Sequence, residues 1–431
     1  MAANTDKSLQ KQLIYSIFVR NHTREGTFKA IIPDLPRIRE LGTDIIWLMP
    51  IHPIGKAARK GSLGSPYAIA DYRKINPEYG TLEDFRDLVD AIHQQGMKCL
   101  IDVVYNHTSP DSLLYQTHPE YFYHKPDGRP GNHVGEWTDI IDLDYQVKEL
   151  WDYQIETLIY WAQFVDGFRC DVASFVPLEF WKAARQAVEQ VHPHTIWLAE
   201  TVHRSFGQLA RRSGLYSGRD TEMYEAFDLE YDYDTREAFD GLLTGRTALN
   251  HYLDLLSFQE SVYPENYNKL RFLENHDTER IASLIKDETV MENYLALLFF
   301  LKGTAMIYGG QEYGNSVRPD LFNKDSIDWT VEHDFTPLIR RLVQIRQEQF
   351  GCCDYFEAQA DEKNQIAVCY RYNPSNQLVG IFSLQGKTAA AEVQLPDGIY
   401  TDLISGSDLE IRDHQLTSIG RPVIIKQHIK K

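Results

Sequence analysis

The stretch TLEDFRDLVDAIHQQGMKCLIDVV, residues 81–104, holds one complete helix-then-strand unit and decides the fold class. Thr81 is placed to cap a helix over residues 82–95, and Gly96 is placed to end it. The run that follows, residues 98–104, predicts a strand buried on both faces, which is typical of a parallel sheet. The helix is predicted from one apolar stripe at helical spacing, formed by Leu82, Phe85, Leu88, Val89 and Ile92.

The same alternation continues on both sides of this unit. Helices are expected over residues 27–41, 147–164 and 178–191, and from Thr336 with Pro337 at its first position. Eight strand-then-helix units predict an α/β fold, a closed (β/α)8 TIM barrel. An open doubly wound sheet is the alternative, but no Gly-x-Gly-x-x-Gly follows the first strand. The other strands are expected at residues 13–19, 43–48, 167–170, 195–199, 226–229, 270–273 and 304–308.

Two stretches depart from this rhythm. Residues 108–140, rich in His, Pro, Gly and Asp, form a long excursion after the third strand, and so long a loop is usually functional or a small subdomain. After about residue 355, short strands alternate with turn sequences such as Asn-Pro-Ser-Asn and Pro-Asp-Gly. We therefore expect a catalytic barrel over residues 1–355, with an insertion at 108–140, and a sandwich-like antiparallel β domain over 356–431.

Composition excludes several functions. The chain has 44 Lys and Arg against 62 Asp and Glu, a net charge of −18, so nucleic acid and anionic membranes are not expected partners. No apolar run is long enough to span a membrane, and no secretory signal is visible at the N-terminus. The five cysteines are odd in number and two of them are adjacent, which favours free thiols over disulfides. These features predict a cytoplasmic protein; its oligomeric state stays open.

Polar side chains collect at the ends of four predicted strands. In a parallel barrel these ends meet at one face, where active sites are built. An Asp or His at a strand end often caps the next helix instead, but this explanation is strained for four strands at once. The residues concerned are Asp102, Asn106, His107, Arg169, Asp171, Glu200, His276 and Asp277.

These residue types suit cleavage of a glycosidic bond, which needs one carboxylate near the anomeric carbon and one carboxylic acid beside the leaving oxygen. Arg169 and Asp171 are two apart, so they point to the same face of a strand, where the guanidinium would keep Asp171 ionised. Glu200 lies on the next strand, where we expect it to lack such a partner and keep a raised pKa suited to proton donation.

The four strand-end motifs resemble the four signature regions of the α-amylase family of glycoside hydrolases, in order and over nearly the whole chain. The resemblance implies that Asp171 is the nucleophile, Glu200 the acid and base, and Asp277 the carboxylate that favours a flattened sugar ring. It further implies an α-glucan oligosaccharide as substrate, net retention, a short domain B at residues 108–140 and a C-terminal domain C. Roles in binding the substrate or supporting the site are implied for Tyr67, His107, Arg169, His276 and Asp102, the last of these behind Arg169.

Departures from the family pattern bear on specificity. Typical α-amylases carry Lys-His where this chain has Ser174 and Phe175, and oligo-1,6-glucosidases share Val172, whereas residues 140–144, Ile-Ile-Asp-Leu-Asp, are closer to the amylase form. We expect cleavage of α-1,4 bonds in starch- or glycogen-derived maltooligosaccharides. An α-glucanotransferase or an α-1,6-acting oligoglucosidase of the same family is the alternative. A non-catalytic carbohydrate-binding or partner subunit is more remote, because all three carboxylates are present.

Further candidates follow from the excursion and its neighbours. Asn106 matches a family calcium ligand, to which Asp139 or Asp142 would add carboxylate oxygens, so a structural calcium is a candidate although the chemistry requires no cofactor. The alternative is that Asn106 only hydrogen-bonds the loop backbone. Aromatic side chains of the excursion are candidates for stacking on sugar rings; they are Trp137, Tyr121 and Tyr123.

Overall fold

The computed structural model describes residues 5–134, 137–352 and 354–429. Within these ranges eight parallel strands close into a barrel: β1 (Leu13–Ile17), β2 (Ile45–Leu48), β3 (Lys98–Val103), β6 (Gly167–Cys170), β7 (Ile196–Ala199), β8 (Leu229–Tyr231), β9 (Lys269–Arg271) and β10 (Thr304–Tyr308). Each strand pairs with its neighbours in chain order, and β10 returns to pair with β1. The (β/α)8 barrel expected from the sequence is confirmed.

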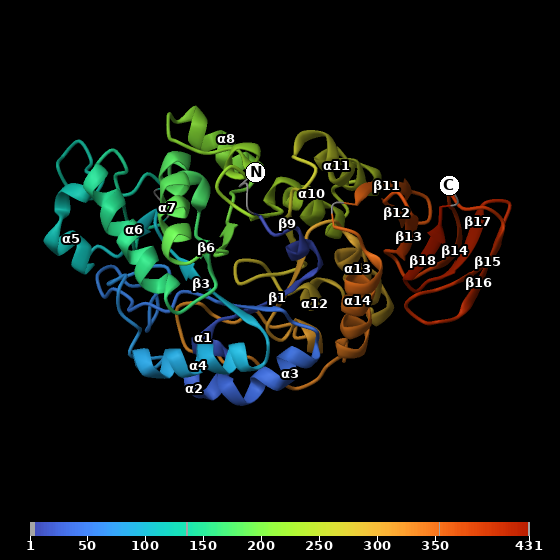
Figure 1. Ribbon diagram of the computed structural model, residues 1–431, viewed down its shortest axis with the longest axis horizontal. Helices are drawn as coiled ribbons and strands as arrows, with labels where there is room; N and C mark the ends of the chain where they lie inside the picture. The colour runs from blue at the N-terminus through green and yellow to red at the C-terminus, as the bar shows by residue number, and fades with distance from the viewer. Residues whose placement is uncertain (1–4, 135–136, 353, 430–431) are drawn as a thin grey trace.

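Helices surround the barrel on its outer side (Figure 1). Many of them are short, because several are single helical turns within the segments that connect the strands. The α-helices outside the excursion are α1 (Val19–His22), α2 (Phe28–Ile31), α3 (Leu35–Glu40), α4 (Leu82–Gln94), α6 (Lys148–Ala162), α7 (Leu178–Val191), α8 (Arg204–Arg212), α9 (Asp220–Met223), α10 (Tyr233–Leu243), α11 (Leu249–Val262), α12 (Ile281–Leu284), α13 (Glu288–Phe300) and α14 (Thr336–Gln349). The 3-10 turns outside it are η1 (Lys7–Lys11), η2 (Ile32–Asp34), η4 (Ala173–Phe175) and η5 (Gln311–Tyr313).

Helix α4 forms as its sequence dictates. The Thr81 hydroxyl accepts from the Asp84 N–H at 3.1 Å, and the Asp84 carboxylate accepts from the Thr81 N–H at 2.9 Å, which completes a capping box. Its apolar face is buried against the barrel at Phe85, Leu88 and Ile92. Burial of this one face fixes α4 on the outside of β3, and the strand then delivers Asp102 to the barrel interior.

Two expected elements differ from the structure. The helix expected over residues 27–41 is split into α2, η2 and α3, because Pro33 and Pro36 have no N–H to donate within a continuous helix. The sixth strand was expected at residues 226–229 but runs over Leu229–Tyr231, because the turn after α9 extends through Phe227, whose N–H bonds to the Met223 carbonyl at 3.1 Å.

The excursion leaves the barrel after β3 and returns before α6. At its base, β4 (His107–Thr108) pairs antiparallel with β5 (Ile141–Asp142). It also carries α5 (Leu113–Thr117) and the turn η3 (Pro119–Tyr121). Because β4 begins at His107, the pairing of its base holds this histidine at the mouth of the barrel.

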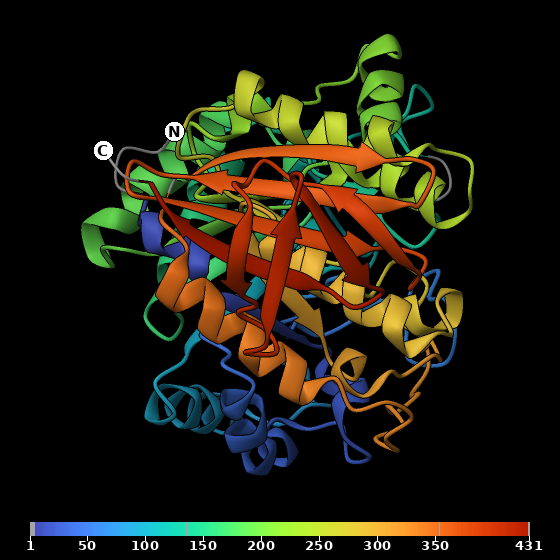
Figure 2. The same ribbon diagram turned by 90° about the vertical axis from the view of Figure 1, so that its right-hand side faces the viewer.

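The C-terminal segment folds into two antiparallel sheets that face each other, seen in front in Figure 2. One sheet consists of β11 (Tyr355–Asp361), β12 (Ile366–Tyr372), β13 (Asn376–Ser383) and β18 (Val423–His428), and the other of β14 (Thr388–Glu392), β17 (Gln415–Ile419), β16 (Asp408–Arg412) and β15 (Gly398–Thr401). Buried Ile366, Val368 and Ile411 belong to the core between them. The first sheet packs on α11 and α13 of the barrel.

None of the helices in the described ranges is long and apolar enough to cross a lipid bilayer. Cys99, Cys170 and Cys369 are buried free thiols and Cys352 is an exposed one, as the expectation of free thiols requires. Cys353 lies outside the described residues.

Candidate active site

The carboxyl ends of the barrel strands surround a cavity of about 420 Å³. The side chains that line it come from the segments that follow β2, β3, β6, β7, β8, β9 and β10, so the barrel gathers segments far apart in the sequence. Among them are the predicted residues Tyr67, His107, Asp171, Glu200, His276 and Asp277. Two further predicted residues, Asp102 and Arg169, lie fully buried beneath the cavity floor.

Arg169 organises the floor of this cavity. Its Nη1 donates to Asp102 Oδ1 at 2.9 Å and to Asp171 Oδ1 at 2.8 Å. Its Nη2 forms an ion pair with Glu200 Oε2 at 3.0 Å. The expectation that Glu200 lacks a cationic partner is therefore wrong: β6 and β7 are adjacent, so one guanidinium reaches both carboxylates.

One positive charge thus serves three nearly buried carboxylates. Burial raises the pKa of Asp171 to about 6, and the Arg169 charge only partly counters it. Burial likewise raises the pKa of Glu200 to about 7, against the pull of Arg169 and with added repulsion from Asp171 and Asp277. Asp171 is thus ionised at neutral pH, as expected, although its pKa is raised above the ordinary value, and Glu200 is the group that keeps its proton to higher pH.

Asp277 is held differently. Its side chain is 46% exposed to the cavity, and its Oδ2 lies 3.1 Å from His276 Nε2. The cavity walls desolvate this carboxylate, but the contact with His276 outweighs that and lowers the pKa of Asp277 to about 2. Asp277 is therefore ionised at neutral pH. Tyr67 completes the group, with its hydroxyl 2.7 Å from His276 Nε2 and its ring stacked on the His276 ring.

His107 stands beside Asp171, with Nε2 4.0 Å from Asp171 Oδ2. Burial lowers the pKa of His107 to about 4, so the imidazole is neutral. The Asn106 amide donates to Nδ1 at 3.1 Å, which leaves the ring proton on Nε2. His107 can therefore donate a hydrogen bond to a sugar hydroxyl from the edge of the cavity.

Val172 is a positioning residue that sequence reasoning did not find. Its φ of 36° and ψ of 42° lie in the left-handed region, which is strained for a β-branched side chain. In this conformation the Val172 N–H donates to Glu200 Oε2 at 2.8 Å. The sequence carried no signal for this, because nothing in residue type marks a valine for positive φ.

Other cavity walls were also missed. Lys60 and His203 line the cavity from the loops after β2 and β7, and Phe206 lines it from the first turn of α8; no strand-end motif contains them. Of the three aromatic candidates in the excursion, Trp137 lines the cavity. Tyr121 instead stacks on His118, with ring centroids 4.6 Å apart, and Tyr123 lies against His133.

The candidate calcium ligands are engaged with protein groups. The Asp139 carboxylate pairs with Lys60 Nζ at 2.8 Å, and Asp142 Oδ2 accepts from His133. The Asn106 amide contacts His107. Calcium takes six to eight oxygens, and within the described residues no cluster of three or more His, Cys, Asp or Glu side chains is arranged to hold a metal. The donor set therefore does not fit this ion.

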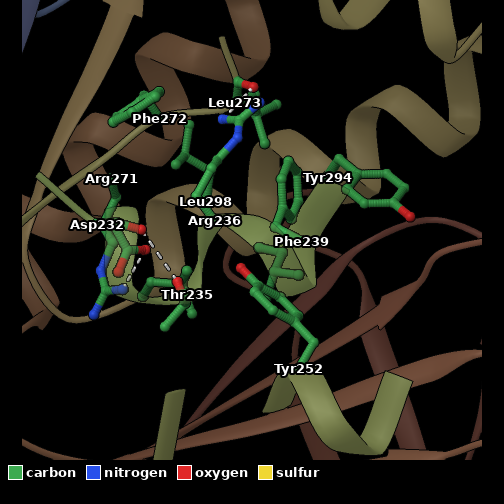
Figure 3. A pocket seen from close by; sticks show the side chains of 12 residues that line it. Asp232, Thr235, Arg236, Phe239, Tyr252, Arg271, Phe272, Leu273, Tyr294 and Leu298 are labelled. Atoms are coloured by element: carbon green, nitrogen blue, oxygen red, sulfur yellow. Dashed lines mark hydrogen bonds and ion pairs between the residues drawn. The ribbon is translucent and has the colours of Figure 1, made fainter. Parts of the chain in front are cut away.

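A second cavity lies beside β9, between α10, α11 and α13 (Figure 3). It measures about 20 Å³, which accommodates about one water molecule. Its charged groups are already paired, since Arg271 Nη1 donates to Asp232 Oδ2 at 2.6 Å and Arg236 Nη1 donates to the Leu273 carbonyl at 3.0 Å. We assign it no substrate.

Comparison with known proteins agrees with the geometry. Residues 4–338 match the family model for the catalytic domain of α-amylase, and residues 357–425 match that for the bacterial α-amylase C-terminal domain. The chain belongs to the α-amylase family. Enzymes of this family act on α-glucans, so the cavity at the barrel mouth is the candidate site for an α-glucan.

Solved structures of this family resemble the chain throughout. An α-amylase from Lactobacillus plantarum is 46% identical with a TM-score of 0.94, and the match covers 98% of this chain and all of that one. The maltogenic α-amylase AmyB from Thermotoga neapolitana is 30% identical with a TM-score of 0.87, over 98% of this chain and all of that one.

Curated relatives include transferases as well as hydrolases. An α-1,4-glucan:maltose-1-phosphate maltosyltransferase from Rhodospirillum rubrum is 30% identical over 90% of this chain and 60% of its own length. The α-amylase MalA of Haloarcula japonica is 26% identical over 92% of this chain and 58% of its own length. The chain thus spans less than two thirds of the length of either relative.

Proposed function

We propose that this α-amylase-family member is a retaining glycoside hydrolase that cleaves α-1,4 bonds in maltooligosaccharides. The observation that carries the proposal is the attachment of Asp171 and Glu200 to adjacent nitrogens of the single Arg169 guanidinium. This arrangement supports the short spacing of about 5–5.5 Å that retaining enzymes have, rather than the about 6.5–9.5 Å of inverting ones.

In the first step, an Asp171 carboxylate oxygen bonds to the anomeric carbon while Glu200 donates its proton to the departing glycosidic oxygen. In the second step, Glu200 takes a proton from water, the water oxygen bonds to the anomeric carbon, and the bond to Asp171 breaks. The pKa order supports these roles, because Glu200 at about 7 keeps its proton after Asp171 at about 6 has lost its own.

The remaining residues act on the sugar ring. Ionised Asp277 stabilises positive charge developing at the anomeric centre, and neutral His107 hydrogen-bonds a sugar hydroxyl, as does His276. Tyr67 packs along the ring. Asp102 holds Arg169 in place from below through two hydrogen bonds, at 2.9 and 3.1 Å. The steps use no metal or cofactor, since the Glu200 carboxyl transfers the proton in both of them.

The test is reducing-sugar release from maltoheptaose by Asp171→Asn, with Asp127→Asn on the surface of the excursion as the matched control. We expect activity to vanish in the first variant and persist in the second. In Glu200→Gln given α-maltosyl fluoride, a maltosyl adduct on Asp171 should accumulate in the intact-protein mass spectrum, because fluoride leaves without acid assistance. Undiminished activity of Asp171→Asn, or β-configured first products by NMR, contradicts the proposal.

A transferase is the second candidate, and the Rhodospirillum rubrum maltosyltransferase favours it. In that case a sugar hydroxyl, rather than water, accepts the glycosyl group from Asp171. Chromatography of products at high maltotriose distinguishes the two: longer oligosaccharides early in the reaction indicate transfer. Maltoheptaose, pullulan, isomaltose and trehalose tested in parallel decide the bond type, and a preference for isomaltose would favour the α-1,6 alternative.

The unpaired thiols support a cytoplasmic location.

A further inference from the structure

Tyr233 lines the active-site cavity and is not one of the residues that the sequence marked. It is the second residue after β8, the strand that lies between β7 and β9 in the barrel. Glu200 directly follows β7, and Asp277 lies in the segment after β9. The order of the strands therefore places Tyr233 between the acid and the carboxylate that acts on the sugar ring.

The electrostatics of Tyr233 agree with this position. Burial raises the pKa of its hydroxyl above the ordinary value, and the negative charges of Asp277 and then Glu200 raise it further. The hydroxyl is therefore protonated over the whole pH range in which Asp171 and Glu200 titrate. Tyr233 thus has one O–H to donate.

The direction of a single hydrogen bond shows that this O–H is not used within the protein. Asn275 Oδ1 accepts from the N–H groups of Asp277 and Thr278 at 2.9 and 3.1 Å, which fixes the orientation of the Asn275 amide. Its Nδ2 then lies 3.0 Å from the Tyr233 oxygen. An amide nitrogen only donates, so Tyr233 is the acceptor and keeps its own proton for another partner. Within residues 5–134, 137–352 and 354–429 that proton meets no acceptor.

Three rings hold the Tyr233 side chain in place. The His203 ring stacks on it with centroids 4.0 Å apart, and Tyr231 and Phe272 pack against it edge to face at 5.0 and 5.9 Å. The hydrogen bond from Asn275 holds the oxygen as well. The donor is therefore in position before a ligand enters, and little further entropy is lost when it binds one.

We propose that Tyr233 is a further catalytic residue, whose O–H donates to the water molecule that attacks the glycosyl-enzyme and holds this water beside Glu200. The inference rests on the proposed function, in which the second step needs a water molecule that gives a proton to Glu200. A neutral donor suits this place, because it binds the water oxygen and leaves both water protons free, one of them for the Glu200 carboxylate.

Tyr233 keeps its own proton throughout the second step. The water oxygen bonds to the anomeric carbon, one water proton goes to Glu200, and the bond between the anomeric carbon and Asp171 breaks. In the first step the departing glycosidic oxygen occupies the place beside Glu200. A donor substrate without a sugar leaving group is therefore needed to separate the contribution of Tyr233 to the second step.

The test measures the two steps separately in Tyr233→Phe, which removes the hydroxyl and keeps the ring between its three neighbours. With α-maltosyl fluoride, rapid quench and intact-protein mass spectrometry give the rates at which the maltosyl-enzyme forms and decays. We expect decay to slow about tenfold, the scale of one lost hydrogen bond, and formation to change by less than about twofold. In the steady state, kcat and KM for the fluoride should fall together.

Tyr267→Phe is the matched control, because Tyr267 is also buried and its hydroxyl donates to Glu260 Oε1 at 2.8 Å, outside the cavity lining. It should leave both rates at the wild-type value. Equal slowing of formation and decay in Tyr233→Phe, which a general loss of folding would give, overturns the assignment, and so does an unchanged rate of decay. A wild-type protein that forms no maltosyl-enzyme and releases no fluoride instead contradicts the proposed function.

Discussion

Replacing Asp102 with asparagine removes one negative charge from beneath the active site while preserving side-chain size. Asp102 Oδ1 and Asp171 Oδ1 lie 2.9 and 2.8 Å from the same Arg169 nitrogen. Their mutual repulsion is one of the causes that raise the pKa of Asp171, after burial. The substitution therefore makes the Asp171 anion easier to form, both by removing this repulsion and by leaving more of the Arg169 charge to Asp171.

The magnitude follows from the separation. Two oxygens that share one nitrogen at these distances are less than about 6 Å apart, and unit charges at that range repel by about 3 kcal/mol at an effective dielectric of 20, or about two pKa units. The pKa of Asp102 is itself raised by burial to about 6, so this group is about half-ionised where Asp171 titrates. The expected fall in the pKa of Asp171 is thus about one unit.

The assay is kcat/KM for maltotriose between pH 4 and 9. In the wild type, activity falls below about pH 6 as Asp171 gains a proton and above about pH 7 as Glu200 loses one, which gives a narrow bell. In Asp102→Asn the acid limb should move about one unit lower, and the alkaline limb should move less. Asp127→Asn, an exposed carboxylate, should leave both limbs in place. An acid limb that stays or moves to higher pH refutes the charge-sharing argument.

Three further outcomes are expected. Dialysis against EDTA should leave the melting temperature and activity unchanged, because Asp139 and Asp142 are paired with protein groups; a loss restored by calcium would contradict this. Lys60→Met should lower the unfolding free energy in urea by about 1 kcal/mol, since it strands the nearly buried Asp139 carboxylate, whereas Lys125→Met on the excursion should not. Asp277→Asn should lower kcat for maltotriose by at least about 100-fold at unchanged melting temperature, and a change in KM alone would rule out its role at the anomeric centre.

Sequence reasoning reached the barrel because the pattern of residues 81–104, an amphipathic helix followed by a strand buried on both faces, recurs along the chain. The same logic located the strand ends, and with them Asp171, Glu200 and Asp277. It misplaced the sixth strand because residues 226–229, Ala-Phe-Asp-Leu, are apolar at three of four positions but begin in the turn after α9. Apolar residues are equally suited to a turn that packs on the barrel and to a buried strand, so composition could not distinguish the turn from the strand.

What could not be predicted depends on contacts between segments distant in the chain. Phe206 became part of the cavity only through Trp137, some 70 residues before it, and Phe175 behind it. The Lys60 ammonium meets Asp139 across two loops. Neither pair has a spacing that periodicity can detect, because loops at the barrel mouth have no repeat. The charge sharing at Arg169 was not predicted either: the barrel places β6 and β7 next to each other, but the sequence does not show that Arg169 Nη2 reaches Glu200.

The sharing of Arg169 explains how two neighbouring carboxyls can differ in protonation without differing much in burial. Asp102, Asp171 and Glu200 together would bring three negative charges to one positive charge, which is unfavourable for nearly buried groups. The site relieves this by retaining a proton near neutral pH, and Glu200 holds it because its pKa is the highest of the three, despite the Val172 N–H that favours its anion. Asp171 is thereby left ionised beside a protonated Glu200, the pairing that the first step of a double displacement requires. Asp102 therefore does more than hold Arg169 in place. Its negative charge offsets part of the positive charge of Arg169 and so raises the pKa of Asp171. A residue that does not touch the substrate thus helps to set the pH range in which Asp171 is ionised while Glu200 is protonated.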